Sequence, residues 1–134
     1  MAKNVKLYKK GIKTKLTTNF VSTEFDCNCK YPDCQWTKID LTHVEKLQEL
    51  RKKLKSPIKI TSGYRCEEYN KDVGGASKSR HKEGDASDLQ VRTKTPDQVA
   101  NAAEKLVFDG IGRYNTFTHL DSRGWKSRWD FRKK

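Results

Sequence analysis

Two histidines and one aspartate are the residues best suited to chemistry in this sequence. His81 and Asp88 are separated by six residues, and His119 follows in a later segment, Phe117–Asp121. Imidazole nitrogen and carboxylate oxygen are zinc ligands, and three protein ligands leave one tetrahedral position open for water, as in catalytic zinc sites. The set therefore predicts a zinc-dependent hydrolase.

A nearby carboxylate is a candidate general base. Alternation along a strand places the side chains of His119 and Asp121 on the same face. A carboxylate beside an activated water can accept its proton. A histidine and an aspartate at this spacing are weak evidence when taken alone. The third histidine, His43, is interpreted as a half-buried packing residue of a helix.

Two helices are predicted by apolar residues at helical spacing. The first covers about residues 40–54 and ends before Pro57, because a residue that precedes proline avoids helical dihedrals. The second begins at Thr95, which is followed by a proline and by a glutamine that can close a capping box. We expect Val107 on its buried face and Gly110 at its end.

Short, partly alternating segments predict the strands. They cover residues 58–61, 86–91, 111–114 and 117–121. The loop over 62–79 is long for a small domain, and such loops usually carry function. The expected fold is therefore α+β, with a small, mostly antiparallel sheet packed against two helices.

The length of 134 residues fits one domain with a modest core. The lysine-rich residues 1–15 lack periodicity and predict a basic N-terminal arm, which leaves residues 16–134 as a single domain. No apolar run approaches the roughly 20 residues that span a bilayer. No secretory signal is recognised at the start, so we expect synthesis in the cytoplasm, with export that needs outside help.

The net charge of +12 predicts attraction to polyanions, among which are the anionic polymers of the bacterial envelope. No nucleic-acid-binding motif accompanies the basic residues, and the aromatic residues follow no stacking pattern. Specific nucleic-acid binding is therefore not expected.

Four cysteines leave three alternatives open. Cys27, Cys29, Cys34 and Cys66 could bind a second, structural zinc ion, although Cys-x-Cys is not the usual spacing. They could form two disulfides outside the cytoplasm, or stay reduced within it.

Several motifs, in their order and spacing, resemble those of the M15 zinc peptidases. They are Ser62–Cys66, Asn70, Gly74–Ala76, Ser79–Asp88, Gly110–Tyr114 and His119–Asp121. The resemblance covers about residues 20–129. The family contains D-Ala-D-Ala carboxypeptidases and related peptidoglycan peptidases, and its metal site is shared with the hedgehog signalling domain.

The resemblance implies a hedgehog-like fold and zinc bound by His81, Asp88 and His119. It places Arg65 beside the zinc, where a guanidinium can stabilise the oxyanion of the tetrahedral intermediate, and it places Ser79 at the substrate.

The general base does not follow from the resemblance in the same way. Several relatives have an acidic residue three positions before the last ligand, where this chain has Thr116. Others have a histidine two positions before it, where this chain has Phe117. Asp121 is therefore the first candidate for the base, and Glu83 is the second.

The resemblance implies a monomeric zinc metallopeptidase that cuts peptidoglycan stem peptides, either as a carboxypeptidase or as an endopeptidase. A small chain without a leader fits a phage endolysin that reaches the bacterial wall after release. Two other classes stay open: a non-catalytic zinc-binding module of the same fold, and a basic nucleic-acid-binding domain whose cysteines hold zinc.

Overall fold

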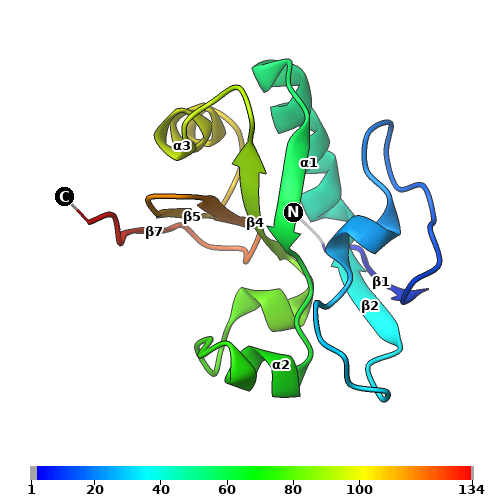
Figure 1. Ribbon diagram of the computed structural model, residues 1–134. Coiled ribbons are helices and arrows are strands. Elements are labelled where there is room, and N and C mark those ends of the chain that lie inside the picture. Colours follow the sequence, from blue (N-terminus) through cyan, green and yellow to red (C-terminus); the bar gives the residue numbers. More distant parts are fainter. Residues whose placement is uncertain (1–2, 134) are drawn as a thin grey trace.

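A five-stranded sheet forms the centre of the protein, as the computed structural model of residues 3–133 shows (Figure 1). Its strand order is β3-β4-β6-β5-β7, and every neighbouring pair is antiparallel except β5 and β7. The strands are β3 (Ile58–Ser62), β4 (Ala86–Val91), β5 (Gly110–Arg113), β6 (Thr118–Asp121) and β7 (Ser127–Asp130). The prediction of an α+β fold with a mostly antiparallel sheet is confirmed.

Two helices, α1 (Leu41–Leu54) and α3 (Pro96–Glu104), cover one side of this sheet (Figure 1). Val44, Leu47 and Leu50 of α1 are fully buried, and they belong to the same core as Leu89 of β4 and Leu120 of β6. Burial of a large aliphatic side chain stabilises the fold by about 1.5–3 kcal/mol. The helical spacing read from the sequence therefore identifies the face that builds the core.

The start of α3 agrees with the prediction, but its end does not. The Thr95 side chain accepts a hydrogen bond from Gln98 N, and the Gln98 side chain accepts one from Thr95 N, which closes the capping box. The helix ends at Glu104, and Gly110 begins β5 instead of ending the helix. Val107 is 70% exposed, because the chain has left the helix there and Phe108 enters the core.

A second, two-stranded sheet pairs β1 (Val5–Lys9) with β2 (Trp36–Asp40). The predicted N-terminal arm over residues 1–15 is therefore wrong for Val5–Lys9, which is paired along its whole length. The strand is exposed at nearly every position, and Leu7 is 61% exposed. Only Tyr8 of this strand packs against the core, and one partly buried side chain is too little hydrophobic pattern to predict the pairing.

The long segment between β3 and β4 contains a third helix and a 3₁₀ turn that the sequence did not predict. They are α2 (Glu67–Asp72) and η2 (Arg80–Glu83). A second 3₁₀ turn, η1 (Ser22–Phe25), precedes β2. Figure 1 shows α2 on the side of the molecule away from α1 and α3. At six residues, α2 is too short to show a helical period in the sequence.

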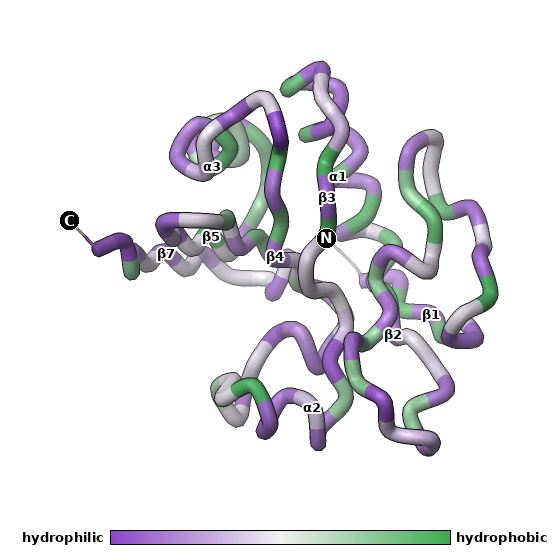
Figure 2. The backbone as a smooth tube through the Cα atoms, in the orientation of Figure 1, coloured by the Kyte–Doolittle hydropathy of each residue, from purple (hydrophilic) through white to green (hydrophobic). Residues whose placement is uncertain are grey.

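Hydropathy follows this layering. Figure 2 shows hydrophobic residues on β3, β4 and parts of α1 and α3, whereas the outer turns and loops are mostly hydrophilic with single hydrophobic positions. No helix within residues 3–133 combines the length and the hydropathy needed to cross a membrane.

The interpretation of His43 as half-buried is wrong, because only 1% of this residue is exposed. Its two ring nitrogens form hydrogen bonds with Ser122 Oγ at 2.9 Å and Ser87 Oγ at 3.0 Å. Burial lowers the pKa of His43 to about 3. The folded protein therefore holds this imidazole neutral. Its hydrogen bonds connect α1 to Ser87 of β4 and to Ser122, which follows β6.

We predict that the difference in stability between the wild type and His43→Gln depends on pH. In the unfolded wild type, His43 has the ordinary histidine pKa of about 6.5 and binds a proton below that pH. In the folded protein its pKa is about 3, so the imidazole stays neutral down to about that pH. The wild type should lose up to about 1.4 kcal/mol per pH unit relative to the variant as the pH falls through this window. Urea unfolding between about pH 7 and pH 4 checks this, and a difference that stays constant with pH would contradict it.

Candidate metal centre

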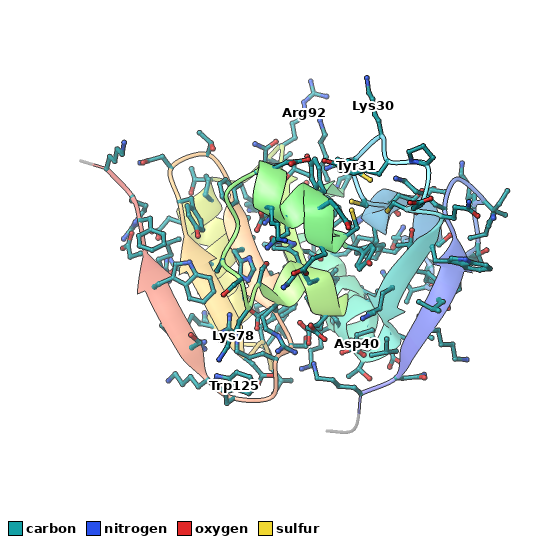
Figure 3. All side chains as sticks on the ribbon, turned by 90° about the horizontal axis from the view of Figure 1, so that it is seen from below. Lys30, Tyr31, Asp40, Lys78, Arg92 and Trp125 are labelled. Carbon is teal, nitrogen blue, oxygen red and sulfur yellow. The ribbon has the colours of Figure 1, made fainter. Side chains whose placement is uncertain are left out.

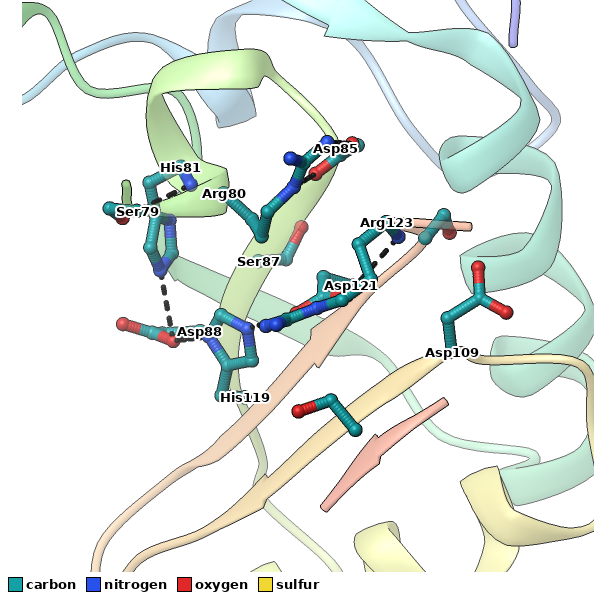
Figure 4. A network of polar contacts seen from close by, with 12 residues as sticks. Ser79, Arg80, His81, Asp85, Ser87, Asp88, Asp109, His119, Asp121 and Arg123 are labelled. Atoms are coloured by element: carbon teal, nitrogen blue, oxygen red, sulfur yellow. Dashed lines mark hydrogen bonds and ion pairs between the residues drawn. The ribbon is translucent and has the colours of Figure 1, made fainter. Parts of the chain in front are cut away.

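Two strands and one 3₁₀ turn bring the three expected metal ligands together (Figure 4). Asp88 of β4 and His119 of β6 are register partners in the antiparallel pair, so their side chains rise from the sheet next to each other. His81 lies in η2, where the Ser79 side chain caps the turn by accepting a hydrogen bond from His81 N at 3.2 Å. Ser79 thus supports a ligand and also lines the cleft described below.

The spacing of the donor atoms fits a zinc ion. Asp88 Oδ1 lies 3.3 Å from His81 Nε2 and 2.9 Å from His119 Nδ1. One donor atom from each of the three residues lies within 4.8 Å of the other two. Ligands at zinc bond lengths of about 2.0–2.1 Å in tetrahedral geometry are separated by about 3.3 Å. The three donors are therefore close to the positions that a bound ion requires.

Hydrogen bonds behind the two imidazoles fix which nitrogen faces the centre. His81 Nδ1 donates to the carbonyl oxygen of Gly63 at 2.8 Å, which leaves Nε2 directed at Asp88. His119 Nε2 donates to Asp121 Oδ2 at 2.8 Å, which leaves Nδ1 directed at Asp88 Oδ1. Partners of this kind orient histidine ligands and raise their basicity in metal sites.

Arg65 lies on the other side of the Asp88 carboxylate. Its Nη2 is 3.4 Å from Asp88 Oδ2, its Nε donates to Ser62 Oγ at 3.1 Å, and its Nη1 is 3.4 Å from Asn70 Oδ1. A Cβ on Gly75 would lie 2.1 Å from the Asn70 amide oxygen, so only glycine allows this close approach. The motif residues around the long loop therefore hold a guanidinium beside the metal ligands.

Asp121 is behind His119 rather than in the cleft. It is fully buried, and its Oδ1 and Oδ2 accept hydrogen bonds from Arg123 Nε at 2.9 Å and Nη2 at 2.7 Å. A Cβ on Gly110 would lie 2.2 Å from this carboxylate, which explains the glycine opposite it in β5.

Neither candidate for the general base has the expected position. Burial raises the pKa of Asp121, but hydrogen bonds from His119 and Arg123 outweigh it and hold the pKa well below its usual range. A carboxylate with such a pKa and with both oxygens occupied is a poor proton acceptor at neutral pH. Glu83 is exposed at the end of η2 and does not line the cleft.

The metal ligands form the floor of an open cleft of about 660 Å³. The cleft is also lined by the segment after α2 and by several aromatic side chains. Trp129 of β7 packs over Gly112, lies 4.9 Å from the His119 ring, and donates from Nε1 to the Tyr114 hydroxyl at 2.9 Å. The aromatic lining residues are Tyr114, Phe117, Trp129 and Phe131, and the basic ones are Arg65, Lys78, Arg80 and Arg123.

Two of these cleft residues carry roles that the sequence reading missed. Arg123 stands between the Asp121 carboxylate and the Trp129 ring, with its guanidinium carbon 5.3 Å from the ring centre. Arg80 is paired with the buried Asp85 at 2.6 Å. Their positions next to predicted site residues, two after Asp121 and one before His81, are the only sequence signal that could have identified them.

Comparison with known proteins agrees with this geometry. The zinc D-Ala-D-Ala carboxypeptidase of Streptomyces albus G is 34% identical in an alignment 91 residues long, which covers 61% of this chain and 36% of that protein. The chain thus matches about a third of the length of this curated relative. The family model described as peptidase M15 matches residues 16–121 and includes all three candidate ligands. The chain belongs to the peptidase M15 family.

Proposed function

We propose that this protein is a zinc metallopeptidase that hydrolyses a peptide bond in bacterial peptidoglycan stem peptides. The observation that carries the proposal is the convergence of His81, Asp88 and His119 on the floor of an open cleft, with Arg65 beside them. Membership of a peptidase family and the name of the relative support this reaction class.

The chain's own residues supply binding and orientation. A zinc ion bound by His81, Asp88 and His119 would polarise the scissile carbonyl and lower the pKa of a water to about 7. Arg65 would hold the oxygen of that carbonyl as negative charge develops, because Ser62 and Asn70 already fix its guanidinium next to Asp88. Of the basic residues that line the cleft, Arg80 and Arg123 are paired with the buried Asp85 and Asp121, and Arg65 and Lys78 are left to favour a substrate with carboxylate groups.

Asp121 acts, in this proposal, through His119. Its carboxylate accepts the Nε2 proton of the imidazole and is itself held by Arg123. This arrangement fixes the tautomer of the ligand, as carboxylate–histidine pairs do in zinc sites. Asp121 is therefore a positioning residue, and Arg123 keeps it ionised.

One observation favours a second candidate function, a non-catalytic zinc-binding module of the same fold. Among the described residues, the cleft is lined by no carboxylate besides the ligand Asp88. A peptidase that uses a side-chain base would need another group there. The two functions differ in turnover, because only the peptidase releases new products from peptidoglycan.

Finer assignments extend the proposal. We propose a phage endolysin that acts on the cell wall, with its net charge of +12 promoting encounter with the anionic envelope. Growth inhibition or lysis by purified protein added to permeabilised bacteria tests this setting. Muropeptide masses distinguish a carboxypeptidase, which removes a terminal D-Ala, from an endopeptidase, which cuts within the stem peptide or a cross-link.

The first experiment digests purified peptidoglycan with the wild type and with His119→Ala, and identifies muropeptides by mass spectrometry. We expect new products from the wild type only, because the variant lacks a metal ligand. Zinc content, measured in parallel, should fall by one equivalent per chain in the variant. Zinc in the wild type without new products would favour the non-catalytic module, and equal products from both proteins would remove His119 from the site.

A second experiment separates the positioning role of Asp121 from that of a base. Asp121→Asn should weaken zinc binding by about 10–100-fold, because the His119 ring loses its charged partner. Glu83→Gln is the matched control and should leave zinc affinity and activity unchanged, since Glu83 is exposed. Unchanged zinc affinity in Asp121→Asn, with activity lost and the acidic limb of its pH profile removed, would instead identify Asp121 as the base.

A third experiment tests Arg65. Arg65→Ala should lower kcat by about 10²–10³-fold, as expected for a lost oxyanion donor. Zinc content should not change, because Arg65 is not a ligand. Arg65→Lys restores the charge but not the fork-shaped donor set, so it should recover activity only in part. Full activity in Arg65→Ala would exclude Arg65 from the reaction.

A further inference from the structure

A second cluster of metal-binding side chains lies outside the cleft. Cys27, Cys29 and Cys34 belong to the loop between η1 and β2, and Cys66 is the N-cap residue of α2. The four Sγ atoms all lie within 4.8 Å of one another. Figure 3 shows sulfur atoms near the labelled Tyr31, at the edge of the molecule.

The sulfur spacing matches tetrahedral thiolate coordination. Cys66 Sγ lies 3.7 Å from Cys27 Sγ and 3.8 Å from Cys29 Sγ. Zinc–sulfur bonds of about 2.3 Å in a tetrahedron separate the sulfurs by about 3.8 Å. A disulfide would instead bring two sulfurs to about 2.05 Å and single out one partner for each cysteine. Cys66 has two partners at nearly equal distances, which suits a shared central ion.

Two donor groups lie beside sulfur atoms of the cluster, at Cys27 and Cys29. The backbone N–H of Cys66 points at Cys27 Sγ at 3.3 Å, and Lys10 Nζ lies 3.4 Å from Cys29 Sγ. A donor and a cation of this kind stabilise negative charge on sulfur. Cys34 N donates to the Tyr31 carbonyl at 3.1 Å, and the resulting turn, with Pro32 at its second position, returns Cys34 to the cluster.

We propose that Cys27, Cys29, Cys34 and Cys66 bind a second zinc ion that is structural. Four protein ligands complete a tetrahedron and leave no position for water, which distinguishes this site from the three-ligand centre in the cleft. The proposal does not depend on the peptidase function, because it rests on the thiol cluster alone.

The ion would fasten two distant parts of the chain beside Arg65. Cys27 and Cys66 are 39 positions apart, and Cys66 directly follows Arg65. The same two segments already meet through the backbone, where Tyr64 N donates to the Phe25 carbonyl at 2.9 Å. Asn28 adds a side-chain hydrogen bond to the Thr61 carbonyl at 3.0 Å. A zinc ion here would therefore stabilise the backbone that positions the guanidinium at the catalytic site.

Metal content in reciprocal variants tests the proposal. Wild-type protein purified with zinc should carry two equivalents per chain by plasma mass spectrometry. Cys34→Ser and His119→Ala should each lose one equivalent, and the double variant should lose both. Cys34 is the choice for substitution because it is partly exposed, whereas Cys27 and Cys66 are buried. One equivalent in the wild type, unchanged by Cys34→Ser, would overturn the proposal.

A measurement on the wild type keeps the test valid if Cys34→Ser fails to fold. The native protein is treated with iodoacetamide before and after a strong zinc chelator, and its mass is recorded. We expect the four thiols to be protected from alkylation before chelation and all four to be alkylated after it. A mass lower by four hydrogens would show two disulfides, and four thiols alkylated without chelation would show free cysteines; either result overturns the proposal.

Substitution with cobalt identifies the type of ligand. Four thiolates should produce an intense sulfur-to-cobalt charge-transfer absorption, which the histidine and aspartate centre cannot produce. The absorption should persist in His119→Ala and disappear in Cys34→Ser. Iron bound at the cluster of aerobically purified protein, with zinc absent, would contradict the choice of zinc.

Discussion

The contact between Asp88 and His119 is the interaction on which the candidate metal centre depends. The two residues are opposite each other in the register of β4 and β6, so the sheet itself sets the distance between two of the three ligands. A shift of one residue in this register would turn one of them to the other face. The buried aliphatic residues that alternate with the ligands, Leu89 and Leu120, hold the register by packing beneath α1 and α3.

The sequence predicted the elements that bury a face, and the structure brings together the three side chains that it proposed as metal ligands. α1, β4 and the start of α3 have clear periodicity or a capping box, and the structure places them within a residue or two of the expected bounds. The exposed strand β1 and the short helix α2 bury too little to leave a period. The position of β1 depends on its pairing with the distant strand β2, which no local pattern records, and α2 has only six residues.

The same distinction applies to the candidate site. His81, Asp88 and His119 follow from residue type and spacing, but the role of Asp121 does not. Strand alternation correctly placed Asp121 beside His119, but it could not show that Arg123 encloses the carboxylate and that the imidazole stands between it and the cleft. The role of a carboxylate near a metal depends on which atoms surround it. For Asp121 these atoms belong to His119 and Arg123, two residues before it and two after it, and the orientation of their side chains is not given by strand alternation.

The strand β7 joins the sheet only through its parallel pairing with β5, beyond the strands that carry the ligands. It contributes Trp129 to the aromatic lining of the cleft, and it lies after residue 121, where the match to the family model ends. Substitutions on this outer strand can therefore change the lining of the cleft while the three expected metal ligands stay in place. Under the proposed function, β7 would then alter which molecules fit the cleft independently of the residues that would bind the ion.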